Sequence, residues 1–242
     1  MEKYESIERY GLTKFTLLDY PGKVACTVFV TGCSFRCFYC HNMGLVNYNG
    51  ISDSSKDDRY GLVRYYELFD FLKKRRVMLD GVCVSGGEPC AKENIVQLLT
   101  DIRKLGYKIK LDTNGYHPDK LKEIIDLGLV DYIAMDVKTW KTEYYARLVH
   151  IPEDEFDPGR IRESINLIRN SKIEYEFRTT VVNGLLDEMD IYCTAALIAG
   201  ADKYFLQSYV GNEYSAYSAE EMHKFLETVK TFVPNAELRG VD

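Results

Sequence analysis

The sequence predicts an α/β fold, a partial (β/α)6 TIM-like barrel of parallel strands that stays open on one side. Short β-branched runs are each followed by a segment with helical apolar spacing, and this alternation recurs along the 242 residues. The first run, residues 24–30, is nearly continuous in apolar residues, which is typical of a parallel strand covered on both faces. A closed eight-fold barrel typically needs about 250 residues. Since only six strand–helix units are visible, an open barrel is favoured, with a doubly wound sheet as the structural alternative.

The strands are expected in the order in which their β-branched runs occur. After residues 24–30, further strands should cover residues 81–84, 107–112, 132–137, 175–182 and 203–207. In both folds the carboxyl ends of parallel strands carry the chemistry. Residues that directly follow these strands are therefore the first candidates for a site.

Helices are expected between the strands, from apolar residues spaced by three and four. Clear stripes cover residues 95–105 and 222–232, and the second begins with the capping-box pair Ser218 and Glu221. Pro118 lies where a first helical turn tolerates proline. Three glycines follow helical stripes, where left-handed C-caps are expected: Gly106, Gly128 and Gly200.

Composition and charge indicate an ordinary globular protein. Hydrophobic residues make up 46% and charged residues 28%, and 31 Lys and Arg against 37 Asp and Glu leave a net charge of −6. These values exclude disordered and fibrous classes. The mild acidity argues against a nucleic-acid or membrane partner, and the basic run at 73–76 fits a helix C-terminus, which favours cations.

One domain is expected over residues 1–242, because no linker or low-complexity tract divides the chain. Its core should cover about residues 15–210, and a C-terminal helix and strand should cover residues 211–242. No apolar run approaches the roughly 20 residues of a membrane span. Residues 1–16 lack the apolar stretch of a secretion signal, so the cytoplasm is the expected location.

Three of the seven cysteines crowd into the loop after the first strand. Cys33, Cys37 and Cys40 form C-x3-C-x2-C, which points to metal chemistry rather than disulfides. A structural zinc site needs a fourth ligand, and His41 is badly placed beside Cys40. A four-cysteine electron-transfer cluster would need a remote thiol, for which the candidates are Cys83 and Cys90. The third alternative is a cluster held by three cysteines, with one iron open to another ligand.

Polar residues follow the next strands. Gly86 and Gly87 lie in a Ser-Gly-Gly-Glu-Pro segment, where glycine permits close backbone approach and Glu88 could accept a hydrogen bond from an ammonium group. A strand-to-helix turn with a capping carboxylate is the alternative. Asp112 begins Asp-Thr-Asn-Gly, which also suits an Asx-turn. Asp136 and Lys138 share one strand face and could converge on one anionic or polar ligand, and a surface salt bridge is the alternative.

With Tyr39 directly before its last cysteine, the cysteine motif resembles that of the radical S-adenosylmethionine (SAM) superfamily. The order of this motif and the Gly-Gly-Glu-Pro segment is also similar to that superfamily. The resemblance implies that Cys33, Cys37 and Cys40 hold three irons of one [4Fe–4S] cluster. The amino and carboxylate groups of SAM would bind the fourth iron.

Within this superfamily, the chain resembles the activases of glycyl-radical enzymes in particular. Residues 15–23 (FTLLDYPGK) and the His41-Asn42 pair after the last cysteine match their pattern, and similarity extends to residues 239–240. The chain is most similar to the longer-form activases of anaerobic ribonucleotide reductase, then to the pyruvate formate-lyase activating enzyme. Residues 41–61 contain no further cysteine run, so only one cluster is expected.

The resemblance implies a set of SAM-binding residues and a monovalent cation at the SAM carboxylate, surrounded by the Asp-Thr pair and the later aspartate. The implied contacts are Tyr39, Gly86, Gly87, Glu88, Asp112, Thr113, Asp136, Lys138, Arg178 and Gln207. For Arg178 and Gln207, a core-edge arginine and a strand-end glutamine are the alternatives. Cys90, after the Gly-Gly-Glu-Pro segment, is expected to be a small apolar filler, with a reactive thiol near the site as the alternative. The tyrosines at 209, 214 and 217 suit either a partner surface or the edge of the core.

The resemblance also implies an activity that needs no acid or base side chain. An electron from flavodoxin or ferredoxin would cleave SAM to methionine and a 5′-deoxyadenosyl radical, which removes a Cα hydrogen from a glycine of a partner glycyl-radical enzyme. Two alternatives remain at this point. One is a radical SAM enzyme acting on a small molecule, a nucleobase or a peptide. The other is a non-enzymatic iron–sulfur or zinc module.

Overall fold

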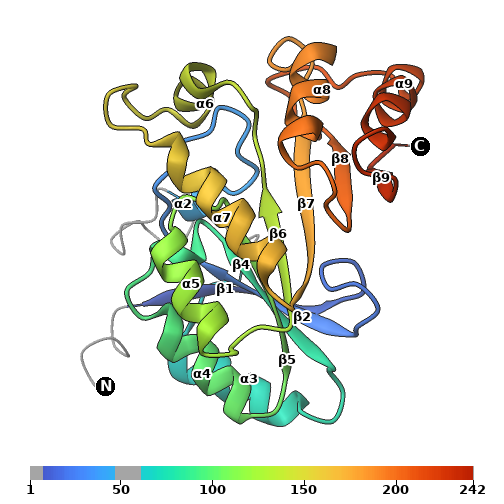
Figure 1. Ribbon diagram of the computed structural model, residues 1–242. Helices are drawn as coiled ribbons and strands as arrows, with labels where there is room; N and C mark the ends of the chain where they lie inside the picture. The colour runs from blue at the N-terminus through green and yellow to red at the C-terminus, as the bar shows by residue number, and fades with distance from the viewer. Residues whose placement is uncertain (1–7, 47–60, 242) are drawn as a thin grey trace. The chain divides into compact units, whose positions relative to one another are not determined.

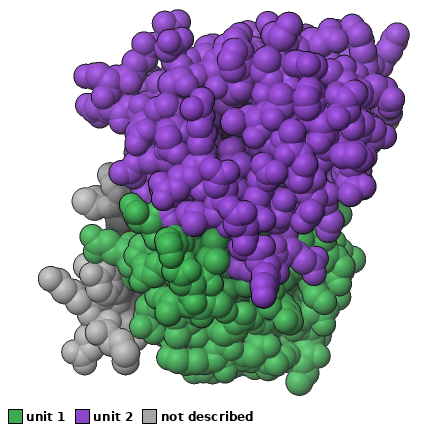
Figure 2. Space-filling model, viewed as in Figure 1, with its two compact units in different colours: residues 1–34, 42–113, 119–133 green, residues 35–41, 114–118, 134–242 purple. Residues whose placement is uncertain are grey.

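The computed structural model describes residues 8–46 and 61–241, and Figure 1 shows its elements. The chain divides into two compact units, coloured separately in Figure 2. Unit 1 comprises residues 1–34, 42–113 and 119–133, and unit 2 comprises residues 35–41, 114–118 and 134–242. The expectations for the first seven residues and for residues 47–60 lie outside the described part of the chain.

Unit 1 is built on parallel strands with an antiparallel edge. Its strands are β1 (Arg9–Thr16), β2 (Ala25–Val30), β3 (Val63–Arg64), β4 (Gly81–Gly86) and β5 (Lys108–Thr113). Its helices are α2 (Met43–Val46), α3 (Tyr65–Arg75), the 3-10 turn η2 (Pro89–Ala91), α4 (Ile95–Lys104) and most of α5 (Pro118–Asp126). The strand order is β3-β1-β2-β4-β5, followed by the start of β6 (Tyr132–Asp136). Strands β2, β4 and β5 run parallel, whereas β1 is antiparallel to β2 and β3.

The sequence reasoning missed strand β1. Its burial does not alternate, because Tyr10, Gly11 and Leu12 are all buried and the three residues that follow are exposed. A half-buried strand is recognised by its period of two, and this strand lacks it. Strand β3 has only two residues, which is too short to give a pattern.

The register between β2 and β4 brings two loops together. Val30, the last residue of β2, pairs with Gly86, the last residue of β4. The cysteine loop and the Gly-Gly-Glu-Pro segment therefore leave the sheet of unit 1 at the same edge. This is the carboxyl edge on which the sequence placed a site.

Unit 2 continues from the end of β6 as strands β7 (Glu174–Val181), β8 (Tyr204–Ser208) and β9 (Ala236–Arg239), paired in that order and parallel from β7 on. Its helices are α6 (Thr142–Val149), α7 (Pro158–Asn170), α8 (Glu188–Leu197) and α9 (Ala219–Lys230). Helix α9 buries the predicted stripe from Met222 to Val229, and Ser218 and Glu221 form the predicted capping box at its start. The predicted C-terminal helix and strand are thus α9 and β9.

The six predicted strands correspond to β2, β4, β5, β6, β7 and β8. The three predicted cap glycines all have positive φ, between 62° and 82°, and α5 begins at Pro118. Among the described residues, none of the helices has both the length and the apolar character that a bilayer crossing requires. The observed class is α/β with a mostly parallel sheet, as the alternation predicts.

Candidate functional site

In unit 1, backbone contacts join the start of the cysteine loop to the Gly-Gly-Glu-Pro segment. The N–H of Gly87 donates to the carbonyl of Val30 at 2.9 Å, and the N–H of Glu88 donates to the carbonyl of Gly32 at 2.9 Å. A Cβ at Gly87 would lie 1.8 Å from the Gly32 oxygen. Glycine is therefore needed here because the two loops touch, which is a stronger reason than approach to a ligand.

Asn42 adds a side-chain link to the same loops. Its Nδ2 donates to the carbonyl of Gly86 at 2.9 Å, across 44 residues of sequence. The N–H of Gly32 in turn donates to the carbonyl of Leu45 on α2 at 2.9 Å. Asn42, the second residue of the His41-Asn42 pair, thus has a structural role, because its side chain fixes the end of β4.

Glu88 is almost completely buried, with 1% of its surface exposed. Its Oε1 accepts hydrogen bonds from the hydroxyl of Thr113 at 2.7 Å and from the N–H of Cys90 at 2.9 Å. These bonds connect the predicted SAM-binding segments after β4 and β5. Cys90 is buried, and burial raises the pKa of its thiol well above the usual value. This agrees with its expected role as a small apolar filler.

Asp112, at the end of β5, has partners that the sequence reasoning missed. The ammonium of Lys110 forms an ion pair with its Oδ1, and the hydroxyl of Ser85 donates to its Oδ2 at 2.9 Å. Lys110 Nζ also lies 3.8 Å from the sulfur of Cys83, the residue paired with it in the sheet. Two signals in the sequence could have revealed this arrangement: the two-residue spacing of Lys110 and Asp112, and an otherwise apolar strand containing a lysine.

In unit 2, the rest of the cysteine loop is folded as a tight turn. The N–H of Cys40 donates to the carbonyl of Cys37 at 3.2 Å, and the N–H of Arg36 donates to the carbonyl of Val149 at 2.8 Å. Burial raises the pKa of the Cys37 thiol to about 11, although Lys138 acts in the opposite direction. The phenol oxygen of Tyr39 is buried and has no hydrogen-bond partner among the described residues.

Asp136, Lys138 and Arg178 form an ion-pair group at the ends of β6 and β7 in unit 2. Lys138 Nζ lies 3.0 Å from Asp136 Oδ2, and Arg178 Nε lies 2.9 Å from Asp136 Oδ1. Burial acts to raise the pKa of Asp136, but Arg178 and then Lys138 outweigh it and hold that pKa well below the usual value. Lys138 Nζ also lies 5.8 Å from the centre of the Tyr39 ring. The predicted residues of these three segments are therefore close together.

The remaining predicted residues have plainer surroundings. Gln207 lies on β8, paired with Thr180 of β7 and Arg239 of β9. Tyr209 is buried in an apolar cluster of unit 2 that includes Tyr39, which favours the core-edge interpretation for this tyrosine. The basic run at 73–76 lies in the last turn and C-cap of α3, as expected.

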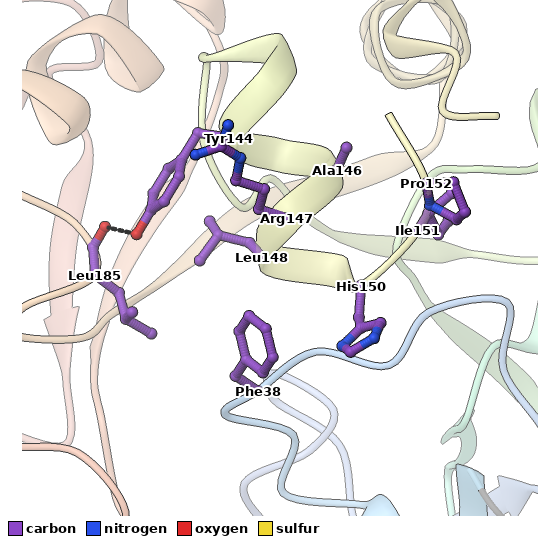
Figure 3. Close-up of a pocket in the computed structure, with 9 residues that line it drawn as sticks. All are labelled: Phe38, Tyr144, Ala146, Arg147, Leu148, His150, Ile151, Pro152 and Leu185. Carbon is purple, nitrogen blue, oxygen red and sulfur yellow. Dashed lines mark hydrogen bonds between the residues drawn. The ribbon is translucent and has the colours of Figure 1, made fainter. Parts of the chain in front are cut away.

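A pocket of about 560 Å³ lies beside the cysteine loop within unit 2 (Figure 3). Phe38, which stands between two of the motif cysteines, lines it together with residues of α6 and with Leu185. The Phe38 ring lies 5.5 Å from that of His150, which ends α6 with a left-handed φ of 54°. The hydroxyl of Tyr144 donates to the carbonyl of Leu185 at 2.5 Å, on the other side of the pocket. Helix α6 therefore supports the loop through an aromatic contact.

The chemistry of the three motif cysteines fits a [4Fe–4S] cluster with one iron left for another ligand. All seven cysteines are free thiols. Cys33 lies in unit 1, and Cys37 and Cys40 lie in unit 2. In the described part of the chain, no three or more His, Cys, Asp or Glu side chains have the arrangement of a ready-made metal site. The fit therefore rests on the number and spacing of the thiols and on the unpartnered Tyr39 oxygen, which suits a polar ligand.

Comparison with known proteins identifies the family. The model of the Radical SAM superfamily matches residues 27–192, so the chain belongs to this superfamily. A protein of Methanocaldococcus jannaschii, named on a provisional basis as a glycyl-radical enzyme activating enzyme, is 28% identical over 246 aligned positions, which cover 96% of this chain and 95% of that protein. The pyruvate formate-lyase-activating enzyme of Clostridium pasteurianum is 27% identical over 192 positions, which cover 78% of this chain and 73% of that enzyme.

Solved structures give the same fold. A radical SAM methyltransferase from Sphaerobacter thermophilus aligns with a TM-score of 0.68 at 13% identity, over 91% of this chain and 67% of that one. The predicted partial barrel class is thus confirmed, as is the resemblance to activases. The chain is a radical SAM enzyme, whose cofactors are a [4Fe–4S] cluster and S-adenosylmethionine.

Proposed function

We propose that this enzyme activates a partner glycyl-radical enzyme, and that the partner is an anaerobic ribonucleotide reductase. The observation that carries the proposal is the end-to-end similarity to the Methanocaldococcus jannaschii protein. The similarity covers 96% of this chain and 95% of that protein, and therefore includes both units. The choice of ribonucleotide reductase rests on the resemblance of the whole sequence, including residues 15–23, to the longer-form activases of that enzyme.

In this proposal, Cys33, Cys37 and Cys40 hold the cluster as thiolates. When bound, the cluster and SAM together supply a carbon radical that can remove a hydrogen atom from a glycine Cα. The chain itself contributes binding and orientation. The backbone of Gly86 and Gly87 and the buried Glu88–Thr113 pair fix one set of SAM contacts.

The other set of proposed SAM contacts lies in unit 2. Tyr39 brings a buried phenol oxygen, and Lys138 and Arg178 bring positive charge held in place by Asp136. Positive groups in a water-poor site are suited to an anionic carboxylate. No side chain is required to move a proton in this scheme, and the role of Gln207 stays a prediction.

A reduced flavodoxin or ferredoxin is the proposed electron donor, because a low-potential electron must reach the cluster. The cytoplasm is the proposed location, since free thiols and an oxygen-sensitive cluster need a reducing compartment.

The experiment is anaerobic reconstitution with iron and sulfide, followed by incubation with SAM, a reduced donor and a purified anaerobic ribonucleotide reductase. We expect a glycine-centred doublet in the EPR spectrum of the partner, and its splitting should collapse when the glycine Cα carries deuterium. Cys40→Ser should abolish the signal, whereas Cys193→Ser, a substitution of a thiol outside the motif, should retain it. Cleavage of SAM without a doublet on any glycyl-radical enzyme would contradict the activase proposal and leave the superfamily assignment intact.

A further inference from the structure

The ion pair between Lys110 and Asp112 bears on the charge balance at the carboxyl end of β5. Both side chains are shielded from water, with 3% of the Lys110 side chain and 16% of the Asp112 side chain exposed. A buried ammonium is retained in a protein when a carboxylate compensates it, because either charge alone would be strongly destabilised. The two residues therefore act as one electrically neutral group.

The sheet register places side chains of β4 beside this ion pair. Lys110 and Asp112 are two residues apart on β5 and share one face. Cys83 of β4 pairs with Lys110, and Ser85 lies two residues further along β4 on the same face. The Lys110 ammonium thus lies 3.8 Å from the Cys83 sulfur and is paired with the Asp112 carboxylate. The Ser85 hydroxyl donates to the other oxygen of that carboxylate at 2.9 Å.

This arrangement does not fit the monovalent cation that the family resemblance implies at Asp112. Both oxygens of Asp112 already have partners, and one of these partners carries a full positive charge. In unit 2, both oxygens of Asp136 are likewise engaged, by Lys138 and by Arg178. A sodium or potassium ion at either carboxylate would be held close to a side-chain cation, which repels it.

We propose that the Lys110 ammonium supplies the positive charge beside the Asp112 carboxylate, at the end of β5, in place of an inorganic monovalent cation. The SAM site of this enzyme then carries its positive charge on side chains and needs neither sodium nor potassium. Lys110 is a positioning residue: it holds the Asp112 carboxylate and neutralises it. The inference rests on the assignment of Asp112 to the SAM site and does not depend on the identity of the partner enzyme.

The test compares the wild-type protein in sodium, potassium and choline chloride at equal ionic strength. Three readouts are used: the melting temperature without SAM, the Kd for SAM, and thallium-205 NMR, with Tl⁺ as the monovalent probe. For the wild type we expect the same melting temperature and a Kd within twofold in all three salts, and no bound thallium. A bound thallium signal, or a SAM affinity that falls tenfold in choline, would overturn the proposal.

Lys110→Met removes the positive charge at similar length and leaves the charge of the Asp112 carboxylate uncompensated by Lys110. This variant should gain what the wild type lacks: a SAM Kd at least tenfold tighter in sodium or potassium than in choline, and a thallium signal. Lys108→Met is the matched control, because Lys108 is an exposed lysine of the same strand, also paired with an aspartate, and it should acquire no salt preference. A folded Lys110→Met that is indifferent to the cation would contradict the proposal.

Where Lys110→Met does not fold, the double variant Lys110→Met/Asp112→Asn replaces both charges, which removes the uncompensated negative charge. It should fold and show no thallium signal. A thallium signal from this double variant would show that the ion binds without Asp112, contrary to the proposal. None of these measurements uses the glycyl-radical assay, so their failure is distinct from failure of the activase proposal.

Discussion

The amide of Asn42 donates to the carbonyl of Gly86 at 2.9 Å, and so connects the residues after the cysteine motif to the end of β4. Both residues belong to unit 1. The contact gives a structural reason for an asparagine two residues after Cys40. Its donor fixes the strand end at which Gly87 meets Gly32, so it orders a segment proposed to bind SAM.

Asn42→Ala should weaken SAM binding by about fivefold, since a lost hydrogen bond of this kind is worth about 1 kcal/mol. Isothermal titration of the reconstituted enzyme with SAM measures the change. The control is Asn235→Ala, in which the lost amide donor bonds the carbonyl of Asp202 at an exposed position. Equal affinities for the wild type and Asn42→Ala would show that the bond does not order the segment.

Gly87→Ala should lower the free energy of unfolding by about 3 kcal/mol or more, because the added Cβ would meet the Gly32 carbonyl oxygen at 1.8 Å. Gly184→Ala is the comparison, since its Cβ would meet nothing within 4 Å and only its φ of 84° is unfavourable. That cost should be about 1–2 kcal/mol. Chemical denaturation measures the free energy of unfolding of both variants. Similar losses of this free energy in the two variants would mean that the two loops can move apart.

Tyr39→Phe should leave the unfolding free energy of the cluster-free protein unchanged or slightly higher. The phenol oxygen is buried without a partner among the described residues, so its removal takes away a desolvation penalty. SAM affinity of the reconstituted enzyme should fall instead. A drop in cluster-free stability, with no change in affinity, would assign the hydroxyl a purely structural role.

Arg239→Ala should destabilise the protein by about 3–5 kcal/mol, because it leaves the buried carboxylate of Glu176 without its charge partner. The guanidinium forms two bonds to Glu176, of 2.7 and 2.9 Å, and its central carbon lies 3.4 Å from the centre of the Phe205 ring. Arg239→Ala/Glu176→Gln should recover part of the loss in thermal denaturation. No recovery would indicate that the contact with Phe205 dominates.

Acid should weaken the contribution of Asp131. Burial acts to raise the pKa of this carboxyl, but its bonds to Lys108, to the N–H of Ile109 and to Arg103 outweigh burial and lower that pKa. A lowered folded-state pKa adds stability that is present above the unfolded value of about 3.9 and disappears as the pH falls through the folded value.

Asp131→Asn should therefore cost about 1 kcal/mol at pH 7, a modest figure because Lys108 is largely exposed. The difference from the wild type should shrink below about pH 4. Urea titrations over this range measure it. Asp126→Asn breaks an exposed pair with Lys122 and should change the stability little. An equally large loss of stability in this variant would indicate that the effect comes from general surface charge.

The main strands could be predicted from the sequence because each is a buried β-branched run. Residues 24–30 illustrate this, since every residue of β2 except Phe29 is buried. Strand β1 could not be predicted in the same way, because its burial changes halfway along rather than alternating. Pairing with β2 defines it as a strand, and that contact is tertiary.

Motifs in the sequence predict the residues of the candidate site, but they do not predict the contacts among those residues. Contacts of Glu88 and Thr113 with SAM stay a prediction, whereas the structure shows that these two side chains bond each other. Lys110 was missed because a lysine within a strand is ordinarily read as exposed. Only the register of β4 and β5 reveals that it faces Cys83 and Asp112.

Neither compact unit is one continuous stretch of chain, and residues 35–41 belong with a body formed mainly by residues 134–242. During synthesis on the ribosome, Cys37 and Cys40 emerge long before the residues that surround them are translated. No single truncation of the chain can yield either unit as an intact fragment, because each unit is assembled from separate stretches of sequence.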